Sequence, residues 1–316
     1  MGYTACSASK RCKQPNVQGP ERRCRMTPLA QFLPSVIDPY EEVLAYEYLY
    51  SFKGSSLKTV SGQTVDRGLL PTEALEELMV VEEEYLAVKA CVDFKLGLFS
   101  AAIDNTPQYP MKLHSANERV PLIYYRGDIG LVERKSVSIV GARKASDAGK
   151  ARAARLARIL AENGIAVVSG LATGIDTAAL ESAVRNEGKV VAVIGTPIDE
   201  CYPKDNAFLQ SRIGLQHLLV SQVPFYRYSV QPFASKKVYF RERNVTMAAI
   251  SDATVIVEAS DTSGSLIQAR ACIKQGRPLF IMRSCLDNPD VTWPKRFVEA
   301  GAIVLEEPEA LLERLA

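Results

Sequence analysis

The sequence predicts an α/β protein with a mainly parallel, doubly wound sheet that follows a small helical domain. Three strand and turn units follow one another between Ser136 and Gly195. Each begins with an apolar run rich in β-branched residues that stops at or just before a glycine. Strands and helices that alternate through short turns form parallel strands with right-handed crossovers, so the turns meet at the carboxyl edge of one sheet. Ligands of open sheets bind at that edge.

The first unit contains the clearest helix signal. Val137–Val140 predicts a buried strand that stops at Gly141, and Ser146 or Asp147 is expected to cap the following helix. Asn163-Gly164 predicts the end of this helix. Its apolar positions repeat at i, i+3, i+4 and i+7: Ala153, Leu156, Ala157 and Leu160.

The remaining elements follow the same pattern. Ile165–Val168 predicts a second strand, and Asp176 is expected to cap a helix that ends near Gly188. The other predicted strands are Lys189–Ile194, Leu218–Ser221, Thr254–Val257, Leu279–Met282 and Ala302–Leu305, with Leu122–Tyr125 as an edge strand. These elements place residues 103–316 in one α/β domain.

Composition narrows the class of protein. Of 316 residues, 47% are hydrophobic, which is enough for a large core. The formal charge is only +2, so binding of nucleic acid requires a local basic patch. Seven cysteines without a repeated spacing favour free thiols in a reducing compartment. Without a long apolar run or a secretory signal, we expect a cytoplasmic protein that does not enter a membrane.

Two segments precede the α/β domain. Residues 1–25 hold six Lys or Arg against the single Glu21, and we expect them to be a disordered basic tail. Residues 26–102 predict a small, acidic helical domain, in which Pro71-Thr72 resembles a helix start. Cys6, Cys12 and Cys24 lack the paired spacing of a zinc site, so no metal is expected.

Three turns at the predicted sheet edge are suited to phosphate. Each combines glycine or hydroxyl residues with a helix start, where backbone N–H groups are free to bind anions. They comprise Gly141, Ala142, Arg143 and Lys144; Ser169, Gly170, Thr173 and Gly174; and Ser263, Gly264 and Ser265. The first turn lacks the G-x-G-x-x-G spacing, so no dinucleotide cofactor is expected. The alternative for Arg143 is a pair with a surface carboxylate.

A second unusual stretch is Phe225–Arg243, in which aromatic and basic residues alternate. Aromatic faces for bases and cations for phosphates are what binding of a single strand requires. The alternative is that some of these aromatic side chains belong to the core. His114 and His217 are the only histidines and have no partners at catalytic spacing, so we expect no catalytic residues and no enzyme.

Several runs together resemble the DprA/Smf family of DNA-processing proteins, from about residue 106 to residue 276. They are Ser-Ile-Val-Gly-Ala-Arg-Lys-Ala-Ser from Ser138, Val-Val-Ser-Gly-Leu-Ala-Thr-Gly-Ile-Asp-Thr-Ala-Ala from Val167, Ala-Val-Ile-Gly-Thr-Pro-Ile-Asp-Glu-Cys-Tyr-Pro-Lys-Asp-Asn from Ala192, Phe-Arg-Glu-Arg-Asn from Phe240, and Val-Glu-Ala from Val257 with Ser-Gly-Ser-Leu from Ser263. Leu180, Gln222 and Val245 differ from the residues usual in that family.

The resemblance implies an extended Rossmann-like domain, preceded by a SAM-like helical domain, that forms a homodimer. It implies binding and protection of single-stranded DNA, and loading of a RecA-type recombinase in natural transformation and homologous recombination. It also implies a phosphate contact by Arg143, and a basic and aromatic pair, Lys237 and Phe240, ahead of Arg243-Asn244.

Two alternatives use the same sheet edge. One is a nucleoside-monophosphate phosphoribohydrolase of the lysine-decarboxylase-like type, although Asp261–Ser265 lacks the Pro-Gly-Gly-x-Gly-Thr motif of those enzymes. The other is a sensor that binds a small nucleotide without chemistry. The release of a free base would identify the first, and direct calorimetry with nucleotides would identify the second.

Overall fold

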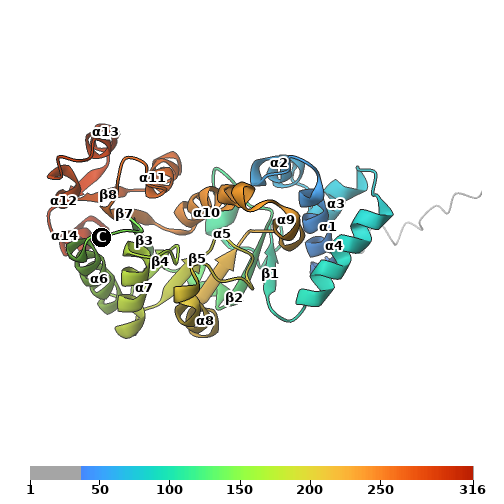
Figure 1. The fold of residues 1–316 in the computed structure, drawn as a ribbon, viewed down its shortest axis with the longest axis horizontal. Helices are drawn as coiled ribbons and strands as arrows, with labels where there is room; N and C mark the ends of the chain where they lie inside the picture. Colours follow the sequence, from blue (N-terminus) through green and yellow to red (C-terminus); the bar gives the residue numbers. More distant parts are fainter. Residues whose placement is uncertain (1–36, 316) are drawn as a thin grey trace, which may run out of the picture. The chain divides into compact units, whose positions relative to one another are not determined.

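The computed structural model describes residues 37–315, and the residues from Asp38 onward form one compact unit (Figure 1). The predicted basic tail, residues 1–25, lies outside the described residues. Helices before residue 100 share a hydrophobic core with the sheet, through side chains such as Leu44 and Tyr46. The domain boundary at residues 102 and 103 stays a prediction. None of the helices in residues 37–315 is long and apolar enough to cross a membrane.

The N-terminal region is helical, as predicted. Its helices are α1 (Pro39–Ser51), α2 (Leu57–Gln63), α3 (Pro71–Glu76) and α4 (Glu82–Lys95). Asp38 caps α1 by accepting a hydrogen bond from the Tyr40 N–H at 2.9 Å. Every residue of α1 from Glu42 to Tyr50 is buried, because α3, α4 and the sheet surround this helix.

One sheet organises the rest of the chain. Its strands are β1 (Ser100–Ile103), β2 (Leu122–Gly127), β3 (Ser136–Gly141), β4 (Ala166–Ser169), β5 (Val190–Val193), β6 (Leu218–Ser221), β7 (Ala253–Glu258), β8 (Leu279–Met282) and β9 (Ile303–Leu305). Their order is β1-β2-β6-β5-β4-β3-β7-β8-β9. All neighbours from β6 to β9 are parallel, which confirms the predicted mainly parallel α/β fold.

The prediction that Leu122–Tyr125 forms an edge strand was wrong. This segment begins β2, which pairs antiparallel with both β1 and β6. The edge strand on this side of the sheet is β1, a short strand that the sequence analysis did not identify. Among the strands of residues 37–315, the pairs β1–β2 and β2–β6 are the antiparallel ones, and β1 connects the sheet to the N-terminal helix α1.

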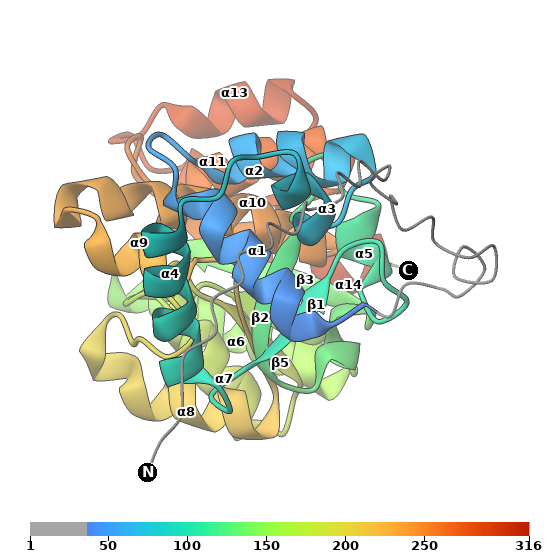
Figure 2. The same ribbon diagram turned by 90° about the vertical axis from the view of Figure 1, so that its right-hand side faces the viewer.

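Helices cover both faces of the sheet (Figures 1 and 2). One face carries α6 (Asp147–Glu162), α7 (Ile175–Arg185) and α8 (Ala207–Gln216), and the other carries α10 (Lys237–Ile250), α11 (Ser265–Lys274) and α13 (Trp293–Glu299). Shorter helices are α5 (Met111–His114), α9 (Phe225–Val230), α12 (Arg283–Leu286) and α14 (Ala310–Leu315), with 3-10 turns η2 (Val65–Arg67), η3 (Ile129–Val132), η4 (Lys204–Asn206) and η5 (Phe233–Lys236). Neighbouring strand residues alternate between two core clusters, as a sheet buried on both faces requires.

The helix cap predicted from the sequence is observed for α6 but not for α7. Ser146 caps α6 by accepting from the Gly149 N–H at 3.0 Å, and α6 ends at the predicted Asn163-Gly164. Asp176 does not cap α7. The N-cap position belongs to Gly174, and the Asp176 carboxylate turns back to the preceding loop, where it accepts from the backbone N–H groups of Gly170 and Ala172.

The aromatic and basic stretch 225–243 forms α9, η5 and the start of α10. Phe225, Tyr228 and Tyr239 are buried, so the expectation that some of these aromatic residues belong to the core is confirmed. Phe233 is exposed and Phe240 is half-buried. The buried rings fix α9 and α10 against the sheet and leave Phe240 at the carboxyl edge of the strands.

Candidate nucleic-acid interface

A cleft of about 690 Å³ opens at the carboxyl ends of β3 and β7. From β3, the chain adds β4, β5 and β6 on one side and later returns to add β7 on the other. Such a reversal of strand order leaves a crevice between the diverging loops, where open sheets bind ligands. The helix α10 crosses from β6 to β7 and forms one wall of the cleft.

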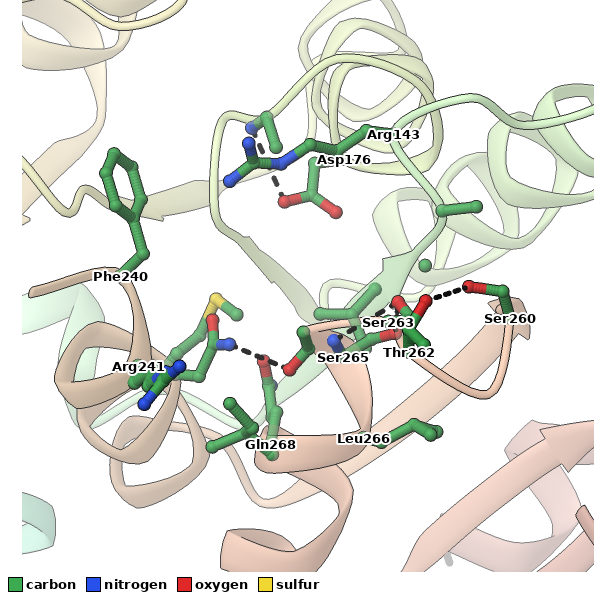
Figure 3. A pocket seen from close by; sticks show the side chains of 18 of the residues that line it. Arg143, Asp176, Phe240, Arg241, Ser260, Thr262, Ser263, Ser265, Leu266 and Gln268 are labelled. Atoms are coloured by element: carbon green, nitrogen blue, oxygen red, sulfur yellow. Dashed lines mark hydrogen bonds between the residues drawn. The ribbon is translucent and has the colours of Figure 1, made fainter. Parts of the chain in front are cut away.

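The structure brings ten of the fifteen predicted site residues to this cleft (Figure 3). They are Gly141, Ala142, Arg143, Lys144, Phe240, Arg243, Asn244, Ser263, Gly264 and Ser265. Gly170 and Thr173 line a smaller cavity of about 130 Å³ beside it. Ser169, Gly174 and Lys237 line neither cavity. Residues from loops far apart in the sequence therefore meet at one edge of the sheet.

The first turn, residues 141–144, is held in place by hydrogen bonds to β7. The Ala142 N–H donates to the backbone carbonyl of Glu258 at 2.7 Å. The Glu258 carboxylate accepts from the Ser146 N–H at 2.9 Å and from the Ser146 hydroxyl at 2.5 Å. These contacts fix the start of α6 and leave the side chains of Arg143 and Lys144 exposed at the rim of the cleft.

The second turn has a mainly structural role. The Ser169 hydroxyl is buried and donates to the Ile139 carbonyl at 2.7 Å. Gly174 has φ +83°, and a Cβ at this position would lie 2.3 Å from the Ala142 carbonyl oxygen. Its left-handed backbone and close approach to the first turn therefore require glycine. Burial raises the pKa of Asp176, although the positive charge of Arg243 opposes this shift.

Arg243 is buried beneath the cleft. Its Nη1 donates to the carbonyls of Gly170 and, at 2.8 Å, of Val193. Burial lowers the pKa of this guanidinium to about 10, which still leaves it charged at neutral pH. The neighbouring Asn244 donates through Nδ2 to the Gly264 carbonyl at 3.0 Å. Both side chains thus join α10 to the loops at the sheet edge.

The third turn presents hydroxyl groups to the cleft. The Ser263 and Ser265 Oγ atoms lie 2.6 Å apart, at the start of α11 (Figure 3). Asp261, in the same loop, accepts from the backbone N–H groups of Thr292 and Trp293 and so caps α13. The Asp261 carboxylate is therefore already hydrogen-bonded to the start of α13.

Two cations of the cleft were not among the predicted site residues. Arg241 and Arg270 line it from α10 and α11, together with Arg143 and Lys144. Within residues 37–315, none of these four side chains forms a salt bridge. Arg241 could have been found from the sequence, because it belongs to the aromatic and basic stretch 225–243. Arg270 could not, because only the packing of α11 against α10 brings it to the cleft.

The cleft therefore suits an anion. Of its lining carboxylates, Asp176 is buried and Asp261 caps α13. The described part of the chain contains no group of three or more His, Cys, Asp or Glu side chains placed to hold a metal ion. Unpaired guanidinium groups near a helix start bind phosphate strongly.

Comparison with known sequences identifies related proteins. The family described as "DNA recombination-mediator protein A" matches residues 101–316. "DNA processing protein DprA" of Streptococcus pneumoniae is 39% identical over 181 residues, which are 57% of this chain and 62% of that protein. "Protein Smf" of Escherichia coli is 31% identical over 208 residues, which are 66% of this chain and 54% of that protein. The aligned parts span only about half to two thirds of these relatives.

Solved structures share the fold. The X-ray structure of DNA processing protein A from Streptococcus pneumoniae matches with a TM-score of 0.68 and 28% identity, over 88% of this chain and 98% of that chain. A structure of DNA processing protein A from Helicobacter pylori, solved to study its single-stranded DNA binding mode, matches with a TM-score of 0.58 and 26% identity. That match covers 69% of this chain and 95% of the other.

Proposed function

Because this chain belongs to the DNA recombination-mediator protein A family, we propose that it binds single-stranded DNA in the cleft at the carboxyl ends of β3 and β7. One observation carries the proposal: four cationic side chains without salt bridges within residues 37–315 line a cleft that also contains an aromatic ring and four hydroxyl groups. The Helicobacter pylori relative, studied for its single-stranded DNA binding mode, supports it.

The site residues have two kinds of role in this proposal. Arg143, Lys144, Arg241 and Arg270 contact phosphates, while Lys237 extends the basic surface at the start of α10. The backbone at Gly141 and Ala142, and the hydroxyl-bearing turn Ser263–Ser265, bind phosphate oxygens. Ser169, Gly170, Thr173, Gly174, Arg243 and Asn244 shape the loops that hold the contacting groups in place. Phosphate contacts carry no sequence information, so binding depends little on sequence.

A single strand suits this cleft better than a duplex. Phe240 lies among the cations at the carboxyl edge of the strands, where only an unpaired base could reach an aromatic ring. We further propose that the protein protects single-stranded DNA and delivers it to a RecA-type recombinase, as a cytoplasmic homodimer and without catalysing a reaction itself. The description of the family as a recombination mediator supports the delivery step.

Fluorescence anisotropy with labelled oligonucleotides tests the proposal. We expect much tighter binding of an oligothymidine than of a blunt duplex of equal length, and an affinity that falls steeply with salt because counterions are released. Equal affinity for both substrates would contradict it. Incubation with nucleoside monophosphates tests the enzymatic alternative, because a phosphoribohydrolase would release free base.

A further inference from the structure

Helix α4 carries a row of exposed apolar side chains on its outer side, called here the α4 ridge. Leu86, Ala90 and Phe94 follow one another at i, i+4 and i+8, and all three are exposed. The exposed fraction is 55% for Leu86 and 85% for Phe94. Residues 79–81, a methionine and two valines just before the helix, are also exposed. The ridge lies at the end of the compact unit opposite α13, and exposed apolar surface of this kind marks a site of protein interaction (Figure 1).

The α4 ridge is held in place from its inner side. Val88 and Val92 are fully buried, because α4 packs there against α1 and α9. Tyr40 of α1 donates through its hydroxyl to the Asp93 carboxylate at 2.5 Å. Lys89 donates to the same Tyr40 hydroxyl at 2.7 Å. The ridge therefore belongs to a helix that is fixed against its neighbours, and a surface already in place lowers the entropic cost of binding a partner.

Glutamate residues border the α4 ridge at the start of the helix. Residues 68–88 include six glutamates and no Lys, Arg or His. Glu76, Glu82 and Glu83 are exposed and form no ion pair within the described part of the chain. The helix dipole favours acidic residues in the first turn of α4, but it does not account for the apolar ridge that follows them. An acidic border repels the phosphates of nucleic acid and attracts a basic partner.

A second α4 ridge would not supply the basic groups that this border attracts. Both lysines of α4 are already paired, Lys89 with Asp93 at 2.7 Å and Lys95 with Asp199. Both sides of a two-fold contact present the same residues, so two α4 ridges would bring their glutamates to one interface without free cations to oppose them. The opposite charges are therefore expected on a different protein.

We propose that the α4 ridge is a docking surface for a second protein, which presents a basic amphipathic segment to it. Apolar side chains of that segment cover Leu86 and Phe94, and its Lys or Arg residues face the glutamates at the start of α4. Rows of side chains at i and i+4 are those on which a partner helix packs. None of the residues that line the DNA cleft belongs to α4, so the partner and DNA can bind at the same time.

A synthetic peptide tests this surface in the full chain. The probe is a labelled amphipathic peptide of leucine and lysine, as long as α4, and fluorescence anisotropy measures its affinity. Wild type should bind one peptide per chain, with an affinity that falls as salt rises. Phe94→Gln and Leu86→Gln should each weaken binding at least about tenfold, because they remove apolar anchors. Phe208→Gln is the matched control, since Phe208 on α8 is 82% exposed, and it should bind like wild type.

Three further measurements complete the test. All three variants should melt like wild type, because the replaced side chains are exposed, and all should bind oligothymidine like wild type. A peptide of the same composition in a non-amphipathic order should bind weakly. The inference would be overturned by equal binding of the two peptides, by an equal loss in Phe208→Gln, or by no binding to wild type. A changed oligomeric state of Phe94→Gln in sedimentation velocity would also overturn it, because the occupant would then be a second copy. Each of these outcomes leaves oligothymidine binding, and with it the proposed function, intact.

Discussion

The guanidinium of Arg243 donates to the carbonyl of Gly170, and the same nitrogen donates to the carbonyl of Val193. These carbonyls lie at the carboxyl ends of β4 and β5, whereas Arg243 belongs to α10. One buried side chain therefore fixes the helix that forms a wall of the cleft against two strands. The sequence analysis included Arg243 among the DNA-binding residues. In the structure, Arg243 stabilises the site from beneath the cleft.

Replacement of Arg243 separates this role from a direct contact. Arg243→Ala leaves two buried carbonyls without this donor and removes the cation that most favours ionised Asp176, so we expect a loss on the order of 3 kcal/mol in the free energy of unfolding. Arg241→Ala, two residues earlier and exposed, is the matched control: it should lower DNA affinity with little change in stability. Urea unfolding and oligothymidine binding measure the two effects. Unchanged stability with abolished binding in Arg243→Ala would show that Arg243 contacts DNA directly.

Gly174 tests how closely the first two turns pack. Gly174→Ala would place a Cβ 2.3 Å from the Ala142 carbonyl oxygen at φ +83°. Gly164→Ala is the control, because Gly164 has φ +68° but no atom within 4 Å of the added Cβ. The control should lose about 1 kcal/mol from the unfavourable φ alone. Thermal melting should show a larger loss for Gly174→Ala, and equal losses would refute the close contact between the turns.

The unpaired cations predict a specific salt dependence. Removal of a single phosphate contact should reduce the slope of log affinity against log salt by about 0.7 for a single strand. We expect this change in Arg143→Gln and in Arg270→Gln, for every oligonucleotide sequence. Arg158→Gln is the control, since Arg158 pairs with Glu162 at 2.8 Å on the outer side of α6. A slope that stays constant in Arg270→Gln would remove Arg270 from the interface.

Stability should depend on pH through Glu242 of α10. Its Oε1 accepts from the Leu57 N–H at 3.0 Å, while Oε2 is buried without a partner among the described residues. Burial raises the pKa of this carboxyl from 4.5 to about 7. The fold therefore favours protonated Glu242. As pH rises from about 4.5 to about 7, the unfolded chain ionises first, and stability is lost.

Glu242→Gln should remove that loss. The amide keeps an oxygen for Leu57 and carries no charge, so the variant should exceed wild type at pH 8 by up to about 3 kcal/mol and by much less at pH 5. Burial likewise raises the pKa of Glu47 to about 7, so some pH dependence should remain in the variant. Chemical unfolding at both pH values measures the difference, with the exposed Glu83→Gln as control. A gain that did not vary with pH would contradict a raised pKa for Glu242.

The sequence by itself determined the parallel sheet and the meeting of its turns. Apolar runs such as Val137–Val140, followed by helix-spaced residues such as Leu156 and Leu160, leave few other arrangements, because local pattern and crossover handedness are both encoded locally. The same patterns located β6 and β8 at their observed bounds. The positions of Gly141, Arg143 and Ser263 at one edge follow directly from this topology.

Only the tertiary structure decided which of these residues are free to contact a ligand. Arg143 and Arg243 look equally suited to phosphate in the sequence, yet one is exposed in the cleft and the other is bonded to two carbonyls beneath it. Arg270 carries no local signal, since it reaches the site through contacts between elements distant in the chain. Local patterns fix the backbone, whereas burial and hydrogen-bond partners depend on long-range packing.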